Sequence, residues 1–567
     1  MKIIGKVLLT WVLLVVLSIV IIYITLQTAW GAKTLGGWVS DNSQYHLSLG
    51  KIDHDWSQPG QITFRDVTLS RPNKPAFLNA GQVVFGLSWH QLTEPRHFRS
   101  LLLQDGNLTL DHSAPIFPIQ ADALRLANMT LNSTTDGWVI QGKEINGGIV
   151  PWQPQAGDSL GEKNQFQLSA TELSVNEIPF QHIFIKGEKN RKALALIDFG
   201  ANIAQGELTG NASRSEEGRW QVEHLRLSNL RLQTSKTLDD IWQSYTRLPP
   251  ISVKRVDLID ARIEGKNWAL NDLDMTLKSV AFENGNWQSH DGELELNASD
   301  IINGDIHLID PIFTLALSDV GVTINQFSTR WQNGLLRSSG SWTRSNHRLQ
   351  LNELAAVALE YTLPENWQQL WQQLWQQKLP DWLSEVLVTK LSASRNLLID
   401  INPDFPFQIT ALDGFGNNLL LVKNHQWGVW AGTLTLNAAN ATFNRNDVRR
   451  PSLALSANDQ NITFSDLSAF SSDGLLEAKA EIGQSAEHTF SLTLTGRSVE
   501  VNLLHHWGWP TLPFEGKGNL SLQLNGNLAQ SHAFKSSLSG TLKATGSNGQ
   551  RINQLMQGGE VSDVTSH

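Results

Sequence analysis

The sequence predicts a mainly β protein. One N-terminal transmembrane helix is followed by an elongated, repeat-built antiparallel β-sheet curled into a taco-like groove, with short tryptophan-bearing helices at the repeat junctions. Three observations support this: an uncharged apolar run at the N-terminus, apolar alternation with a period of two, and segments recurring at roughly 130 to 155 residues. A string of β-sandwiches built from the same units stays open as an alternative to the groove.

The first predicted element is an N-terminal span from Val7 to Leu26, which contains no charged residue. About 20 apolar residues are enough for a helix to cross the ~30 Å hydrocarbon core of a membrane. The span is longer than the apolar region of a signal peptide, and bulky residues stand where a cleavage site needs small ones. Because Lys2 and Lys6 precede the span, residues 1–6 are expected to form a cytoplasmic tail, with the rest of the chain across the membrane.

Composition excludes several classes of partner and chemistry. The 567 residues carry a formal net charge of −10, only 17% of them are charged, and no basic run occurs, which argues against nucleic acid as a partner. The chain has no cysteine, which excludes disulfides, thiolate metal sites and a cysteine nucleophile.

Beyond Asp41 the chain alternates apolar and polar residues, as in "GELELNAS" (292–299) and "GTLTLNA" (432–438). This pattern predicts sheets with one apolar face and one solvated face. A closed core would produce the same alternation as an open groove, so both interpretations remain open for these leucines. The candidate groove-lining residues are Leu294, Leu296, Leu315, Leu317, Leu434, Leu436, Leu492, Leu494, Leu520, Leu522 and Leu524.

The chain also repeats itself. The segments "FRSLLLQDGNLTL" (98–110), "VKRVDLIDARIEG" (253–265) and "VTKLSASRNLLID" (388–400) align without gaps, and a strand pattern follows each. The repeats predict an N-terminal region at 27–97 and a β-repeat region at 98–513, with units near 98–250, 251–383 and 384–513. A C-terminal β segment at 514–548 and a polar tail at 549–567 are expected to follow.

Short tryptophan-bearing segments that end in proline separate the units, at residues 87–95, 238–250, 365–380 and 503–513. The third, "ENWQQLWQQLWQQKLP", predicts a longer helix, with Thr362 and Glu365 as a capping box and Pro380 as its stop. We interpret it as a packing helix at a repeat junction. A membrane-surface role is the alternative, which the absence of lysine from its polar face disfavours. Its apolar residues fall within a ~140° arc, at Trp367, Leu370, Trp371, Leu374 and Trp375.

No pattern of catalytic residues stands out. Asp305 and His307 share one strand face, but two alternate polar positions are what a solvated face provides. His505 and His506 lie in a junction segment, where packing is the simpler role. The "GFG" at 414–416 lacks the continuation of a dinucleotide-binding loop. The sequence therefore predicts no catalytic residue, no metal site and no cofactor, and a chain that is not an enzyme.

Two stretches resemble a known family. "LQTAWGAKTLGGWVSDNSQYHLSLGKIDHDW" (26–56) follows the N-terminal span directly, and "LPFEGKGNLSLQLNGNLAQ" (512–530) lies near the end of the chain. Both are similar to the AsmA family of inner-membrane proteins of two-membrane bacteria, and the resemblance extends over essentially the whole chain.

The resemblance implies a single-pass protein of the bacterial inner membrane with its N-terminus in the cytoplasm and its bulk in the periplasm. It also implies a β-groove similar to that of bridge-like lipid transfer proteins, with phospholipid or related membrane lipids as partners and an outer-membrane contact at the C-terminal end. The expected function is lipid binding or transfer that contributes to outer-membrane biogenesis and envelope integrity. The alternative is an assembly factor for outer-membrane proteins with no lipid conduit.

Overall fold

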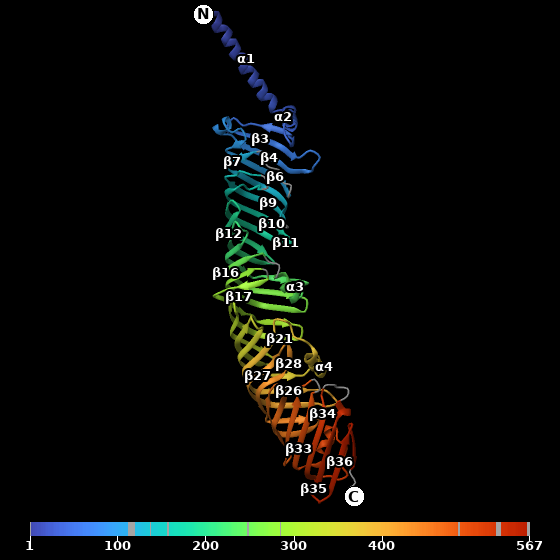
Figure 1. Ribbon diagram of the computed structural model, residues 1–567. Helices are drawn as coiled ribbons and strands as arrows, with labels where there is room; N and C mark the ends of the chain where they lie inside the picture. Colours follow the sequence, from blue (N-terminus) through green and yellow to red (C-terminus); the bar gives the residue numbers. More distant parts are fainter. Residues whose placement is uncertain are drawn as a thin grey trace. The chain divides into compact units, whose positions relative to one another are not determined.

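The structure is a computed structural model that describes residues 2–111, 119–135, 138–155, 158–245, 249–283, 285–485, 488–528 and 534–563. The chain divides into two compact units. Unit 1 comprises Met1–Lys266 and Thr276–Trp287, and unit 2 comprises Asn267–Met275 and Gln288–His567. Strands dominate both units, which confirms the predicted mainly β class (Figure 1).

Unit 1 begins with two helices and continues mainly as strands. Its helical elements are α1 (Lys2–Leu26), α2 (Ala29–Asp41), η1 (Trp89–Leu92) and α3 (Leu238–Tyr245). Its strands are β1 (His46–Ser48), β2 (Lys51–Asp53), β3 (Gln61–Ser70), β4 (Ala76–Gly86), β5 (His97–Phe98), β6 (Ser100–Asp111), β7 (Gln120–Ala121), β8 (Leu124–Thr135), β9 (Trp138–Val150), β10 (Lys163–Val175), β11 (Ile178–Asn190), β12 (Ala193–Ile203), β13 (Gly206–Arg214), β14 (Trp220–Ser228), β15 (Arg231–Gln233) and β16 (Ile251–Gly265).

Unit 2 follows the same plan. β17 (Trp268–Glu283) and β18 (Asn286–Gln288) contain residues of both units. The helical elements of unit 2 are α4 (Trp367–Gln376), η2 (Val501–Trp507) and α5 (Phe534–Ser537). Its strands are β19 (Gly292–Asn297), β20 (Asp300–Asn303), β21 (Ile306–Ser318), β22 (Gly321–Trp331), β23 (Gly334–Thr343), β24 (Arg348–Val357), β25 (Glu360–Thr362), β26 (Glu385–Asp400), β27 (Phe407–Lys423), β28 (Gln426–Asn437), β29 (Asn440–Phe443), β30 (Asn446–Ala457), β31 (Asn461–Ser471), β32 (Gly474–Gly483), β33 (Thr489–Glu500), β34 (Lys517–Asn527), β35 (Ser539–Gly546), β36 (Arg551–Gln557) and β37 (Glu560–Asp563).

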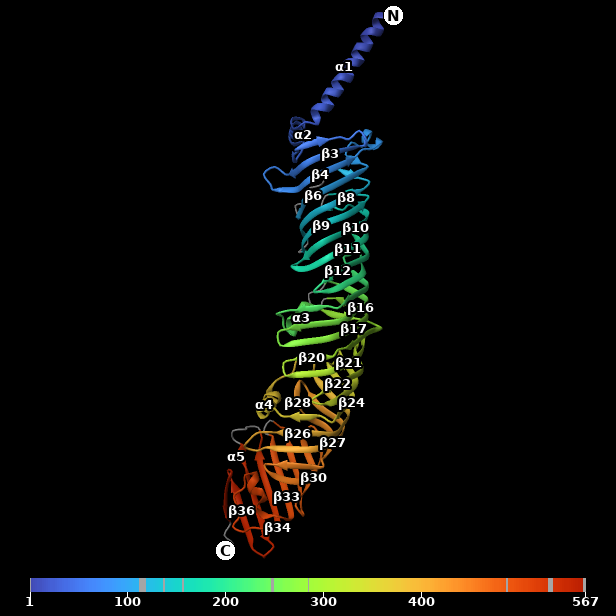
Figure 2. The same ribbon diagram turned by 180° about the vertical axis from the view of Figure 1, so that it is seen from behind.

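Most neighbouring strands pair antiparallel, as from β9 to β14 in unit 1 and from β30 to β37 in unit 2 (Figure 2). This confirms the predicted large antiparallel sheet. Parallel pairs join the strands on either side of a crossover, as in β6–β8, β14–β16 and β24–β26. Segment 98–110 lies mainly on the strand before its crossover, whereas 253–265 and 388–400 lie on the strands after theirs. The three aligned segments therefore occupy different positions in the topology.

Helix α1 carries the predicted N-terminal span. Its Leu9–Leu26 stretch has a mean hydropathy of 2.7 and is 0% buried by the rest of the chain, so by length and composition it could cross a membrane. The Tyr23 hydroxyl is hydrogen-bonded to His54 Nδ1 at 2.8 Å, and the Tyr23 ring packs against the Trp56 ring. The end of the apolar helix is thereby attached to the loop after β2.

Many strands contain a bulge near their middle, which the alternating pattern did not predict. Non-glycine residues adopt positive φ within strands at Asp105 (52°), Asn128 (51°), Asp260 (49°) and Asp310 (46°). The strand register shifts beside several of them, as in β8–β9 and β21–β22. A bulge bends its strand and increases the local twist, so these sheets are bent along a line that crosses successive strands.

Polar side chains pair with the backbone groups that the bulges leave free. Asn128 donates a 2.7 Å hydrogen bond from Nδ2 to Asp105, and its backbone N–H donates to Asn146 Oδ1 at 2.9 Å. In unit 2 the N–H of Arg395 donates to Asp413 Oδ1 at 2.8 Å. Asparagine and aspartate tolerate positive φ better than most residues and can bond nearby backbone groups, which explains their presence in otherwise apolar strands.

Each of the four tryptophan-bearing segments contains a short helical element, namely η1, α3, α4 or η2. The predicted capping box of α4 is wrong. Thr362 belongs to β25, and the helix begins after Asn366, which makes no side-chain capping hydrogen bond. The helix also ends at Gln376, before Pro380 is reached. Instead, the Trp367 indole donates a 2.9 Å hydrogen bond to Asp400 at the end of β26. This contact with the sheet takes the place of a side-chain capping hydrogen bond. Among the other apolar residues predicted for this helix, Leu370 is exposed, and the side chains of Trp371, Leu374 and Trp375 lie outside the described residues.

The segment expected as a polar tail, 549–567, contributes β36 and β37 within its described part. This part of the chain forms strands because some of its side chains are buried against the sheet. Gln554 is buried and Met556 is 7% exposed, and β36 pairs along the edge of β35.

Candidate functional site

The inner face of unit 2 presents a row of side chains that strand pairing connects from β19 to β36. Each member is the direct partner of the next, so all of them lie on one face of the sheet. We call this set the central row: Leu296, Phe313, Phe327, Ser338, Leu354, Leu391, Gly416, Leu434, Leu455, Phe464, Ala480, Leu492, Leu524, Gly540 and Met556.

A second row runs beside it on the same face. Leu436 lies two positions after the central row's Leu434, so both side chains point to the same side of β28. We call this set the cap row: Ala393, Gly414, Leu436, Leu453, Leu467, Ala478, Leu494, Leu522, Leu542 and Gln554.

The structure brings most of the predicted groove-lining leucines together on this face. Leu294 pairs with Leu315, Leu317 with Gly292, and Leu520 with Gly496, while the others belong to the two rows. Their burial differs along the unit. Three are buried, with exposures of 8, 4 and 4%: Leu494, Leu520 and Leu522. The remaining eight are half-buried and retain contact with solvent: Leu294, Leu296, Leu315, Leu317, Leu434, Leu436, Leu492 and Leu524.

The buried end of this face is covered by residues 501–516, which include the junction segment predicted at 503–513. Val501, Leu504 and Phe514 are 0, 4 and 7% exposed, and they pack in one cluster with the buried leucines of β33 to β35. Apolar residues occur throughout this segment, which distinguishes it from α3 with its Asp239 and Asp240. We call residues 501–516 the cap.

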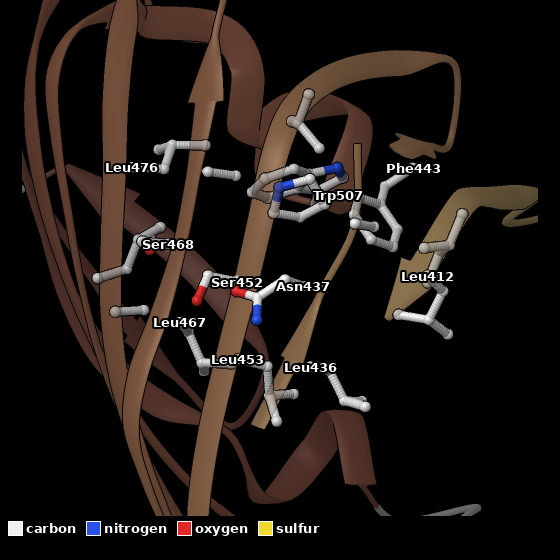
Figure 3. Close-up of a pocket in the computed structure, with 17 residues that line it drawn as sticks. Leu412, Leu436, Asn437, Phe443, Ser452, Leu453, Leu467, Ser468, Leu476 and Trp507 are labelled. Carbon is white, nitrogen blue, oxygen red and sulfur yellow. The ribbon is translucent and has the colours of Figure 1, made fainter. Parts of the chain in front are cut away.

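A cavity of about 260 Å³ lies where the half-buried part of the face meets the cap (Figure 3). Its walls are largely apolar and come from the strands β27 to β33, and Trp507 of the cap contributes an aromatic wall. Sequence analysis missed Trp507 as a lining residue, because its segment has no strand pattern. The principal lining residues are Leu436, Phe443, Leu453, Leu467, Leu476 and Trp507.

Unit 1 has an apolar inner face as well. Near α2 its residues are shielded from solvent, with Val83 and Leu101 only 3 and 2% exposed. An apolar cavity of about 710 Å³ lies there between α2 and strands β3, β4 and β6, with Trp38 and Trp152 among its walls. Farther along the unit, side chains of the same cluster such as Leu194 are half-buried.

One acid of unit 1, Asp257, has a strongly lowered pKa. The Arg255 guanidinium, which bonds Asp257 at 2.7 Å, lowers the pKa of this carboxyl to about 2, and hydrogen bonds from His224 and Thr276 act in the same direction. Asp257 therefore stays ionised at neutral pH. Because an ion pair and two hydrogen bonds satisfy it, the arrangement resembles a structural brace more than a general acid or base.

The other titratable candidates form pairs or structural contacts. His307 lies 2.6 Å from Asp300 across the β20–β21 pair, and Asp305 is in the connecting turn. His505 Nδ1 lies 3.1 Å from the carbonyl of Trp509 and so braces the cap. Among the described residues no group of three or more histidines, aspartates or glutamates could hold a metal ion.

Comparison with known proteins found one curated relative at high similarity. The chain is 46% identical over 569 aligned residues to the AsmA family protein YicH of Escherichia coli (strain K12), covering 100% of this chain and 99% of that protein. No family model matches the chain. No solved structure matches it significantly either.

Proposed function

The chain belongs to the AsmA family, and from this premise we propose that it is a membrane-anchored protein that binds and transfers lipid in the bacterial envelope. Phospholipid is the expected cargo, and the expected roles are in outer-membrane biogenesis and envelope integrity. The proposal places α1 in the inner membrane, residues 1–6 in the cytoplasm and both β units in the periplasm, and it includes no catalytic step.

The observation that carries the proposal is that the leucines and phenylalanines of the central row are half-buried. Leu296, Leu434 and Leu492 belong to different strands, yet a chain of direct strand partners places them on one face, and each retains contact with solvent. Apolar surface left in contact with water is unfavourable at roughly 25 cal/mol per Å². A continuous apolar face of this kind is therefore suited to an apolar ligand laid along it.

The energetics of lipid movement support such a face. Two acyl chains with about 30 CH₂ groups would cost roughly 24 kcal/mol to expose to water, at ~0.8 kcal/mol for each CH₂ group. A protein face that replaces water along the chains lowers this barrier. The outward positions are polar, as at Glu295 and Thr433, so the same strands present a solvated surface on their other side.

The membrane end of unit 1 is also consistent with anchoring. Beside the end of α1, the indoles of Trp30, Trp38 and Trp56 are 69, 64 and 74% exposed. Exposed tryptophans are typical of membrane–water interfaces, where one part of the ring is in an apolar environment and the N–H is solvated. These residues would hold unit 1 against the membrane surface.

Site-specific photocrosslinking in cells tests this function. A benzophenone amino acid is placed in the full-length chain at Leu434 or Leu296, and at their exposed neighbours Thr433 and Glu295 as matched controls on the opposite face. After irradiation, mass spectrometry should find lipid adducts at the two leucine positions and few at the controls. Equal labelling of both faces, or no lipid adduct at either leucine, would contradict the proposal. Protein adducts alone would favour the assembly-factor alternative.

A further inference from the structure

The cap is held firmly along one edge. The Trp509 indole donates a 2.7 Å hydrogen bond to Gln554 Oε1, and both side chains are buried. Asn502 donates from Nδ2 to the carbonyl of Phe514 and accepts from the N–H of Leu512. These bonds tie the two ends of the cap to each other and to β36.

The opposite edge of the cap is held more weakly. There the carbonyl of His506 accepts a hydrogen bond from Asn444 in the β29–β30 turn. The neighbouring Trp507 forms a wall of the cavity, and its indole N–H is buried without a hydrogen-bond partner among the described residues. Gly508 follows with φ of 96°, a backbone conformation that glycine adopts without strain.

The cavity beneath this edge has a size that can be compared with a known case. An apolar cavity of about 150 Å³ holds a benzene molecule, so by proportion about 260 Å³ holds roughly ten carbon atoms. The cap row's Leu436 and Leu453 line both the cavity and the adjoining half-buried face. A chain lying on that face would reach the cavity without crossing a polar surface.

We propose that the cavity beneath Trp507 is the binding site for the end of one acyl chain of a membrane lipid. The inference rests on the proposed function and deepens it, because it specifies where on the apolar face the bound acyl chain ends. The cap covers the face beyond the cavity, where Leu522 and Leu542 are 4 and 0% exposed.

The test plugs the cavity after the protein has folded. Because the native chain has no cysteine, Ala478→Cys gives the full-length protein a single thiol on a half-buried residue of the cavity wall. Reaction with decyl methanethiosulfonate adds a ten-carbon chain, and methyl methanethiosulfonate adds one carbon as the matched control. Lys479→Cys, which is exposed on the opposite face of β32, carries the same decyl group as a second control. Intact-mass measurement verifies complete labelling.

The proteins are reconstituted in vesicles of phosphatidylethanolamine and phosphatidylglycerol. These contain phosphatidylcholine with a diazirine at the last carbon of one acyl chain. After irradiation we expect adducts in peptides from β30 to β33 and η2 of the methyl-labelled protein. The decyl group at residue 478 should lower the yield of these adducts tenfold or more. If the lipid chain loses the burial of only two methylene groups, its affinity already falls about tenfold. The decyl group at residue 479 should leave them unchanged.

Two results would overturn the inference while leaving the proposed function standing. One is adducts on β21 to β24 with none at the cavity. The other is cavity adducts that persist at full yield when the decyl group occupies residue 478. Absence of adducts from the whole inner face would instead refute the proposed function, and the inference with it.

Discussion

Truncating a leucine at each end of the inner face of unit 2 should have unequal effects on stability. Leu542 is 0% exposed and lies beneath the cap, where it pairs with Leu522. Leu542→Ala leaves a cavity that the surrounding side chains cannot fill, and such substitutions cost about 3 kcal/mol within a range of 2–5. Leu296 is half-buried beside Phe313. Leu296→Ala loses roughly half the transfer energy of the side chain and creates no closed void, so we expect about 1 kcal/mol.

Native-state hydrogen exchange of the full-length protein in detergent micelles measures both effects locally. Amides of β34 to β36 should exchange about 100-fold faster in the Leu542 variant, because ~3 kcal/mol corresponds to slightly more than two factors of ten. Amides of β19 and β21 should change about fivefold in the Leu296 variant. Similar costs at the two positions would refute the distinction between a capped end and a solvent-contacting face. A larger cost at Leu296 would show that protein covers the central row there.

Three further substitutions test individual contacts. Asp257→Asn should lower the stability of unit 1 by about 1–2 kcal/mol at pH 7. Arg255 holds the pKa of Asp257 in the folded protein near 2, below the ordinary value of 3.8 for an aspartate. The stabilisation is therefore complete above about pH 4 and is lost as pH falls through about 2. Thermal unfolding between pH 7 and pH 2 should show a flatter pH dependence in the variant. Asn396 is 8% exposed, accepts a hydrogen bond from one backbone N–H and donates to two carbonyls at a bulge. Asn396→Ala should therefore lower the free energy of unfolding by about 3 kcal/mol. A variant whose thermal melt matches that of the wild type would contradict this role. Trp509→Phe removes the buried hydrogen bond to β36. The cap should lose ~1.4 kcal/mol of local stability, so protease cleavage within 501–516 should become about tenfold faster.

Where strands are regular, strand pairing places the leucines selected from the alternating pattern on one face of the sheet. Leu434 and Leu492 were selected from short segments far apart in the sequence, and strand pairing places them in one row. This succeeds because side chains alternate sides strictly along an uninterrupted strand. The choice between open and closed positions could not be made in the same way, because it depends on what lies above the face. Leu494 shows the same alternation as Leu492 but is buried beside the cap.

Bulges explain why a period-two pattern misses some inward residues, as in β27. In β27, Gly414 and Gly416 face inward and the next buried side chain is Leu419, three positions later instead of two. The residue at positive φ between them is Asn418. An extra residue shifts the phase of the alternation, so a period-two pattern read across the bulge assigns the second half of the strand to the wrong face. The signal that could have located these positions is an asparagine or aspartate within an otherwise apolar strand.

The composition of the junction segments then determines whether the face beside them is covered. The segment of α3 begins with Asp239 and Asp240, and acidic residues of this kind favour contact with water. The cap instead supplies Leu503, Leu504 and Leu512, and these three side chains are at most 5% exposed. Burying them against β33 to β35 is favourable only because the inner face there is apolar too. A lipid chain would have to displace this packing to pass beyond the cap, so the cap gives the apolar face of unit 2 a closed end, and lipid on it is expected to leave sideways or back along the row.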